Sequence, residues 1–187
     1  MLRKSWLPQR LLGERITLRP IREADAETIV VLVARYPDVV RRFAFFTVPR
    51  TVDDEKTYLC AMIENPADAI FAIEEKTSGM LVGTVGLHEI DRRNDNARLG
   101  YILFDAAAHG QGLMREAIRL FLSWAFTELG LHKVYLQVFT ENREGIRTDI
   151  ALGFSFEGRI REHYKVGGRY YDLYHLSILK GEWENQQ

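Results

Sequence analysis

The sequence has little of what would tie the protein to a membrane or to a disulfide-stapled scaffold. Its 187 residues include one cysteine, Cys60, so no disulfide can form within the chain. No stretch approaches the roughly 20 apolar residues of a transmembrane helix, and no apolar core of signal-peptide length follows the charged N-terminal residues. We therefore expect a cytoplasmic protein without a membrane partner.

An excess of positive charge is also missing. The chain carries 25 Lys plus Arg against 26 Asp plus Glu, for a formal net charge of -1. Proteins that bind nucleic acids mainly through phosphate contacts need a basic surface, so we expect no nucleic-acid partner. Metal-ligand spacing is lacking too, because His132, His163 and His175 are scattered along the chain, and no metal site is expected.

The chain does have continuous periodic segments, and 47% of its residues are hydrophobic. No repeat and no linker rich in Gly, Ser or Pro divides it, which predicts a single domain over residues 1–187 with a core of about 15–179. The periodicities predict, in order, a strand at 15–19, helices at 23–36 and from Asp53, strands at 70–74, 80–90 and 98–104, a helix after residue 112, a strand at 134–138, a helix at 144–152 and a hairpin turning at Gly167 and Gly168. This order predicts an α+β fold with one mixed, mostly antiparallel central sheet flanked by helices.

A loop with two glycines, residues 109–115 (HGQGLMR), lies between a predicted strand and a predicted amphipathic helix. The first N–H groups of a helix lack intrahelical partners, and together with the helix dipole they favour an anion. Gly110 and Gly112 permit close approach of a phosphate, and Arg115 adds positive charge. An ordinary glycine turn fits the same residues, because they form neither a GxGxxG motif nor a P-loop.

The order of several short motifs resembles the GNAT superfamily of N-acetyltransferases. They are GYILF, HGQGLMREA, HKVYLQV, Asn142 and ALGFSFEG. The resemblance covers about residues 15–179. Together with GLM, EA, LGF and EG, the closing GRYYDLYHLSIL is most similar to the branch with ribosomal-protein N-terminal acetyltransferases and polyamine acetyltransferases.

The resemblance implies acetyl-CoA as co-substrate, bound at a splayed strand pair. It implies a homodimer as well. The loop amides of His109, Gly110, Gln111, Gly112, Leu113, Met114 and Arg115 are expected to hold the pyrophosphate. The strand residues Ile102, Leu103 and Phe104 are expected to pair with the pantetheine arm, which the side-chain amide of Asn142 would also contact.

The sequence departs from the family where the chemistry is done. His109 stands where Gln or Arg is usual, and Asp149 stands at the position of the tyrosine that many relatives use as acid. Gly145 replaces a serine that others use, and Arg98 replaces a common glutamate. An aspartate with an ordinary pKa near ~4 is a poor acid at neutral pH unless burial raises that pKa. Asp149 is therefore either the acid or a contact for the amine, and water is the alternative proton donor.

For the base we expect His88, which has an ordinary pKa near ~6.5. Its neighbour Glu89 is the other choice, and strand alternation predicts that only one of the two side chains faces the site. Glu89 is then a substrate contact. A hydrogen-bonded surface histidine is the plain alternative for His88.

The acceptor side is expected to include Phe43, Phe45 and Phe46, which equally suit a loop anchored to the core. The predicted activity is transfer of acetyl from acetyl-CoA to a primary amine, of a small molecule or a protein N-terminus, by direct attack. The alternative is a non-catalytic acyl-CoA-binding regulatory domain, because the usual Tyr, Ser and Glu are replaced.

Overall fold

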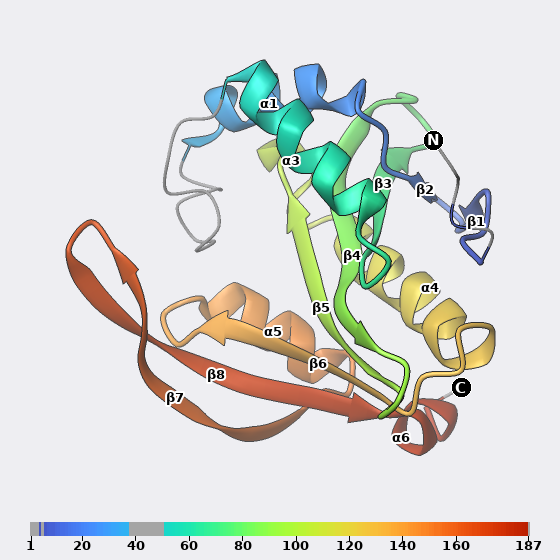
Figure 1. Ribbon diagram of the computed structural model, residues 1–187, viewed down its shortest axis with the longest axis vertical. Helices are drawn as coiled ribbons and strands as arrows, with labels where there is room; N and C mark the ends of the chain where they lie inside the picture. The colour runs from blue at the N-terminus through green and yellow to red at the C-terminus, as the bar shows by residue number, and fades with distance from the viewer. Residues whose placement is uncertain (1–3, 5, 38–50, 187) are drawn as a thin grey trace.

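The structure, a computed structural model, describes Lys4 and residues 6–37 and 51–186. Its centre is an eight-stranded sheet in the order β1-β2-β3-β4-β5-β6-β8-β7 (Figure 1). The strands are β1 (Leu11–Leu12), β2 (Ile16–Pro20), β3 (Ala69–Glu75), β4 (Leu81–Asp91), β5 (Asn96–Leu103), β6 (Lys133–Phe139), β7 (Ser155–Val166) and β8 (Arg169–Leu179). The helices are α1 (Asp25–Arg35), α3 (Val52–Glu64), the short 3-10 helix η2 (Ala106–Ala108), α4 (Leu113–Thr127), α5 (Arg143–Ala151) and α6 (Lys180–Glu184). All neighbouring strands are antiparallel except β5 and β6, which confirms the predicted mixed α+β fold.

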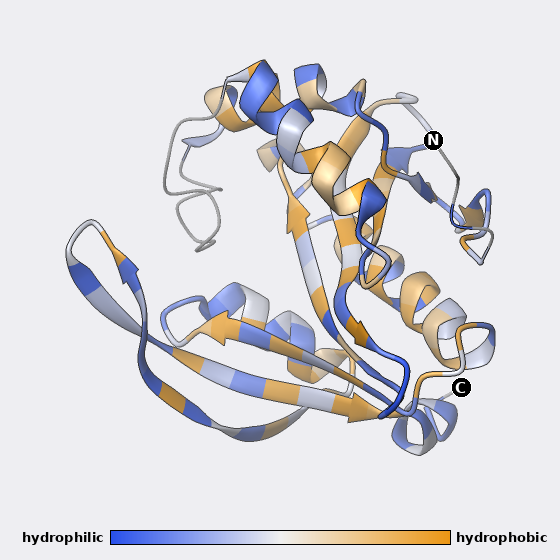
Figure 2. Ribbon diagram, viewed as in Figure 1, coloured by the Kyte–Doolittle hydropathy of each residue, from blue (hydrophilic) through white to orange (hydrophobic). Residues whose placement is uncertain are grey.

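The sheet separates two hydrophobic clusters. On β5, Leu99 and Leu103 belong to the cluster under α4, whereas Ile102, and Phe104 just after the strand, belong to the cluster under α1 and α3. This division follows from the period of two in a strand, which sends successive side chains to opposite faces. Figure 2 shows hydrophobic residues concentrated on α4 and on the strands beside it.

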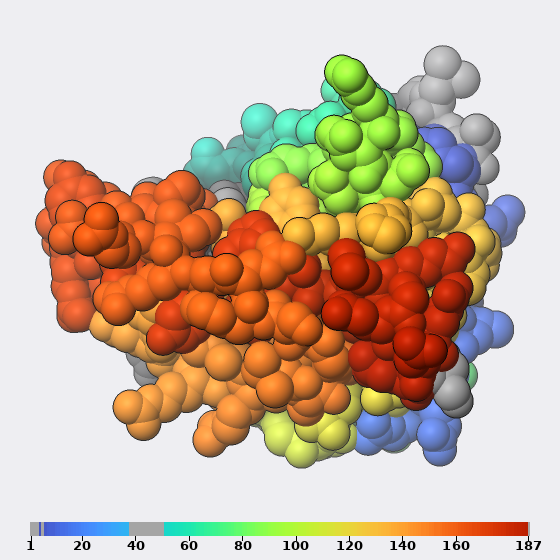
Figure 3. Space-filling model, turned by 90° about the horizontal axis from the view of Figure 1, so that it is seen from below, coloured from blue at the N-terminus to red at the C-terminus, as the bar shows by residue number. Residues whose placement is uncertain are grey.

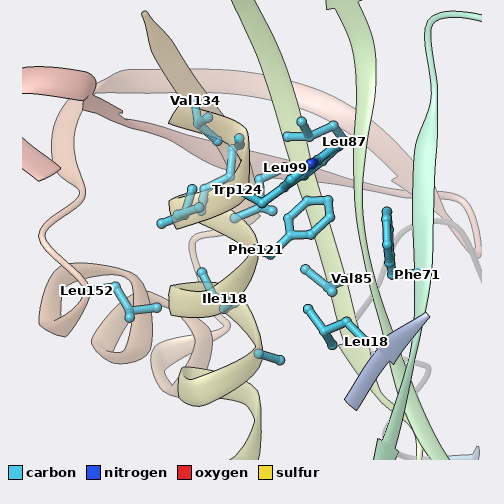
Figure 4. Close-up of a cluster of buried hydrophobic side chains, with 14 of the residues drawn as sticks. Leu18, Phe71, Val85, Leu87, Leu99, Ile118, Phe121, Trp124, Val134 and Leu152 are labelled. Atoms are coloured by element: carbon cyan, nitrogen blue, oxygen red, sulfur yellow. The ribbon is translucent and has the colours of Figure 1, made fainter. Parts of the chain in front are cut away.

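Helix α4 forms because its apolar residues recur at helical spacing and bury against the sheet. Phe121 is fully buried, and its ring centroid lies 5.4 Å from that of Phe71 on β3 and 5.3 Å from that of Trp124. Figure 4 shows these rings packed between α4 and the strands. The core therefore fixes the start of α4, and the loop before it, relative to β5.

Strands β5 and β6 pair only near their N-terminal ends. The register runs from Asn96 opposite Lys133 to Arg98 opposite Tyr135. Beyond this point β5 follows β4 and β6 follows β8, so the two strands diverge (Figure 1). This is the splayed strand pair that the family resemblance predicts. We call the gap between these strands the β5–β6 opening.

Besides η2, two elements are additional to the predicted ones. Strand β1 has only two residues and pairs with β2, and α6 places Trp183 in the core with its ring 6.2 Å from Phe126. Both are too short to show a periodicity. In Figure 3, the long β7–β8 hairpin and α6, orange to red, spread over one face of the molecule. In the described part of the chain, no helix is long and apolar enough to cross a membrane.

Candidate active site

A cavity of about 210 Å³ lies between the loop that precedes α4 and the start of α5. We call it the loop cavity. Its wall consists of Tyr101, Leu103, Ala108, His109, Gly110, Gly112, Leu113, Met114, Arg115, Asn142, Glu144, Gly145 and Thr148. Much of the predicted cofactor site is therefore brought together around one hollow.

The backbone of the loop is arranged for an anion. Gly110 and Gly112 have φ angles of 72° and 80°, in the left-handed region that favours glycine. Gly112 is the N-cap of α4, and no side chain caps this helix end. The N–H groups of the first turn of α4 thus lack an intrahelical acceptor and lie at the positive end of the helix dipole. A phosphate fits this environment.

Arg15, just before β2, braces the loop from outside. Its Nη1 donates to the carbonyl oxygen of Gln111 at 2.6 Å, and its Nε lies 2.9 Å from Oε2 of Glu116 on α4. Its backbone N–H also donates to Glu116 Oε1 at 2.8 Å. The predicted site did not include Arg15. No local pattern indicates that this residue contacts a loop that lies 96 residues later in the chain.

Three of the predicted cofactor residues lie differently from the others. Gln111 is absent from the cavity wall, and its side-chain Nε2 donates to the carbonyl oxygen of Ala107 at 2.8 Å. Ile102 and Phe104 line the larger cavity described next. His109 lines the loop cavity, and its Nε2 lies 2.9 Å from the carbonyl oxygen of Leu103, which ties the loop to the end of β5.

The larger cavity has a volume of about 440 Å³ and extends from α3 across β4 and β5 to β6 and β8. We call it the sheet cavity. Tyr101 and Asn142 line both cavities, so the two hollows meet beside the β5–β6 opening. Two ligands entering from different sides can reach one another there.

His88 is partly buried in the sheet cavity, where it pairs with the buried Asp68. Its Nδ1 lies 3.0 Å from Asp68 Oδ1, and Asp68 is only 3% exposed. Burial lowers the pKa of His88, the positive charge of Arg98 lowers it further, and Asp68 only partly offsets them. The imidazole is thus neutral at pH 7. With Nδ1 held by the carboxylate, Nε2 is left to accept a proton.

The ring of His88 lies over Gly100 on β5. A Cβ built on Gly100 would stand 3.1 Å from Nε2 of His88, closer than ordinary van der Waals contact. A residue larger than glycine at position 100 would therefore displace the His88 imidazole. His88 is opposite Arg98 in the β4–β5 register, on the face of the sheet away from α4.

The prediction that only one of His88 and Glu89 faces the site is wrong. Both side chains line the sheet cavity. The register passes from His88 opposite Arg98 to Asp91 opposite Asn96, so two residues of β4 face one residue of β5. Glu89 is the extra residue, with a φ angle of 55°. This bulge breaks the alternation and turns Glu89 toward Arg98.

Glu89 is committed to two donors. Arg98 Nε donates to its Oε1 at 3.0 Å, and the Tyr135 hydroxyl donates to its Oε2 at 3.0 Å. Burial opposes its ionisation, but the hydrogen bonds from Arg98 and Tyr135 outweigh that effect and lower the pKa of Glu89. An ionised carboxylate with two donors is a weak base, which makes His88 the better acceptor of a proton.

Asp149 on α5 lies on the other face of β5. It is fully buried, and its Oδ1 accepts a hydrogen bond from the Tyr101 hydroxyl at 2.6 Å. Its Oδ2 has no hydrogen-bond partner among the described residues. Burial raises the pKa of Asp149 to about 7, although the Tyr101 hydrogen bond opposes the change. The condition under which an aspartate can serve as acid at neutral pH is therefore met.

Asn142 caps α5 and borders both cavities. Its Oδ1 accepts from the Gly145 N–H at 3.1 Å, and a Cβ at Gly145 would lie 2.8 Å from its Nδ2. Glycine at the position where some relatives carry serine thus makes room for the Asn142 side chain.

Phe43, Phe45 and Phe46 lie outside the described residues. Within residues 6–37 and 51–186, no group of three or more His, Cys, Asp or Glu side chains is placed to hold a metal ion.

Comparison with known proteins agrees with this geometry. A family described as "Acetyltransferase (GNAT) domain" matches residues 15–155. The chain belongs to the GNAT acetyltransferase family. It is 32% identical over 180 residues to the "Probable N-acetyltransferase YjcK" of Bacillus subtilis (strain 168), with 93% of this chain and 99% of that protein covered.

Two further relatives bear on activity. The chain is 28% identical over 179 residues to the "Putative ribosomal N-acetyltransferase YdaF" of Bacillus subtilis (strain 168), covering 94% of this chain and 97% of the relative. The crystal structure of the spermidine N-acetyltransferase from Vibrio cholerae in complex with CoA and spermine has a TM-score of 0.80 and 28% identity, covering 91% of this chain and 99% of that one. This chain is thus an acetyl-CoA-dependent N-acetyltransferase of the GNAT family.

Proposed function

We propose that this GNAT enzyme transfers the acetyl group of acetyl-CoA directly to a primary amine, of a small molecule or a protein N-terminus. The observation that carries this proposal is the meeting of the two cavities at Tyr101 and Asn142, beside the β5–β6 opening. Acetyl-CoA enters from the loop cavity and the amine from the sheet cavity. The two substrates then react in one complex.

The pyrophosphate of acetyl-CoA binds at the N-terminus of α4. Gly110, Gly112 and the first-turn amides contact it, and Arg115 contributes charge at the cavity wall. The pantetheine arm runs past Leu103 and Asn142 toward the opening. Because His109 already holds the carbonyl oxygen of Leu103, the arm pairs with other polar groups of β5.

On the amine side, His88 is the base and Asp68 positions it. An ammonium ion is attracted to the carboxylates of Glu55, Asp68 and Glu89, which all line the sheet cavity. Once the ammonium has lost a proton, its nitrogen attacks the thioester while His88 Nε2 takes the second proton. Glu89, held by Arg98 and Tyr135, contacts the substrate and does not exchange a proton.

The test is release of free thiol from acetyl-CoA across a panel of amines. Spermidine and N-terminal peptides come first, since relatives are named for a polyamine and for ribosomal acetylation. The expected result is a rate that rises with one acceptor, with an acetylated amine recovered as product. If acetyl-CoA binds but no amine raises the rate, the proposal is overturned.

The homodimer remains a prediction of the family resemblance, to be checked by analytical ultracentrifugation.

A further inference from the structure

The departing thiolate of CoA needs a proton, and the residue types that many relatives use are missing from their usual positions. This inference rests on the proposed function. We propose that Asp149 carries a proton on Oδ2 and gives it to the sulfur of CoA, with Tyr101 as the positioning residue that holds the carboxyl group through Oδ1. The buried Asp149–Tyr101 pair thus takes the place of the tyrosine that many relatives carry at the position of Asp149.

Asp149 and Tyr101 lie beside the β5–β6 opening, on the side opposite to His88. Tyr101 packs with the cluster under α4, whereas Arg98, opposite His88, points to the other face of β5. Asp149 approaches the β5–β6 opening from α5 on the Tyr101 side, and both Asp149 and His88 line the sheet cavity. Base and acid therefore flank the opening from opposite faces. An amine attacking from one side leaves the sulfur on the other.

The second support is the orphaned oxygen. Asp149 is fully buried, its Oδ1 accepts from Tyr101, and its Oδ2 has no partner among the described residues. A buried carboxylate oxygen without a donor is costly, whereas a protonated oxygen there is neutral and ready to donate. Burial, which raises the pKa of Asp149 to about 7, agrees with a proton on this oxygen.

Acetyl transfer forms a C–N bond, breaks the C–S bond and moves two protons. The amine nitrogen forms a bond to the carbonyl carbon, and the C–S bond breaks with its electron pair on sulfur. Asp149 Oδ2–H transfers its proton to that sulfur, and His88 Nε2 holds the proton lost by the amine. Exchange with water then returns a proton to Asp149 and removes one from His88.

Other titratable groups share the sheet cavity with Asp149. They are Glu55, Tyr58, Asp68, His88, Glu89, Arg98 and Tyr164. Burial raises the pKa of Asp149, and the hydrogen bond from Tyr101 lowers it. A pH limb that depends on Asp149 is therefore distinguishable from one that depends on His88.

The experiment measures thiol release against pH in the wild type, Asp149→Asn and Tyr101→Phe, with Asp53→Asn, an exposed change on α3, as control. Asparagine keeps the shape of the carboxyl group but carries no transferable proton. We expect Asp149→Asn to lower kcat about 100-fold with an unchanged KM for acetyl-CoA, and to remove the fall of activity above about pH 7. Tyr101→Phe removes a hydrogen bond that lowers the pKa of Asp149, so its alkaline limb moves to higher pH.

Slow hydrolysis of bound acetyl-CoA is a second test of proton donation by Asp149 that needs no amine. Water then replaces the acceptor, and the sulfur needs the same proton. If Asp149→Asn keeps the wild-type rate and alkaline limb, or Tyr101→Phe leaves that limb in place, the inference is overturned. Failure of the proposed function has a different signature. In that case the wild type hydrolyses acetyl-CoA in an Asp149-dependent way but responds to no amine.

Discussion

The loop cavity and the sheet cavity meet at the same opening but are built from different parts of the chain. Backbone geometry shapes the first, where Gly110 and Gly112 adopt left-handed conformations before α4. Side chains shape the second, where Asp68 holds His88 and a bulge turns Glu89 into the cavity. A site built from backbone amides should tolerate changes of side chain, whereas a site built from side chains depends on each partner. Substitutions in the two regions should therefore differ in what they change.

The largest effect is expected in the loop cavity. Gly110→Glu places a negative charge among the amides that we propose bind the pyrophosphate, and we expect acetyl-CoA affinity to fall by about 1000-fold, or about 4 kcal/mol. Calorimetry measures it. Gly79→Glu is the matched control, since Gly79 and Gly110 have φ angles of 69° and 72° and neither has an atom within 4 Å of a built Cβ. Equal loss in both variants would attribute the effect to backbone strain instead.

In the sheet cavity, His88→Gln should spare acetyl-CoA binding and lower kcat about 100-fold, because it removes the proposed base. Asp68→Asn should give a smaller fall, since it loosens the imidazole without removing it. Steady-state kinetics with a saturating amine measures both. His163→Gln, on the exposed part of β7, is the control. A His88→Gln enzyme with the wild-type kcat would exclude His88 as the base.

Asp149 makes stability depend on pH. Its pKa is raised on folding to about 7, so the folded protein binds more protons than the unfolded chain. This contribution to stability is fully present below pH ~4 and is lost as pH rises through about 7. We expect the unfolding free energy of the wild type, relative to Asp149→Asn, to fall by about 2 kcal/mol between about pH 5 and pH 7. Denaturant titrations measure the difference, in which the opposite effect of His88 cancels. A pH-independent difference would contradict a raised pKa.

The smallest effect concerns the space for His88. Gly100→Ala brings a methyl group within 3.1 Å of His88 Nε2, so the imidazole must move away from its position. We expect kcat to fall about 10-fold, a barrier increase of about 1.4 kcal/mol, with acetyl-CoA affinity unchanged. Gly158→Ala on β7 is the matched control, because a Cβ there meets no atom within 4 Å. A fall of the same size in both variants would show that loss of a strand glycine is the cause.

The difference between the two regions also explains what the sequence could predict. The loop before α4, the helix itself and Asn142 follow one another within a short stretch, so local pattern and the family resemblance located them. The Asp68–His88 pair joins a loop to a strand 20 residues later, and the Tyr101–Asp149 bond spans 48 residues. Neither contact has a local signature. A carboxylate 20 residues before a predicted strand histidine is too common a pattern to single out Asp68.

The error at Glu89 has the same origin. Strand alternation is a sound expectation for regular pairing, but a bulge depends on the register with β5, which no local pattern specifies. The fold was more predictable than the site because periodicity reports burial, and burial decides where helices and strands lie. The site depends on which buried groups meet across elements.

We propose that acetyl-CoA and the amine meet in one complex at the β5–β6 opening. Initial rates measured over a matrix of acetyl-CoA and amine concentrations test it most directly. We expect intersecting double-reciprocal lines and no acetylated enzyme, because the amine attacks the thioester itself. Parallel lines, with an acetyl group trapped on the protein after acetyl-CoA alone is added, would contradict it.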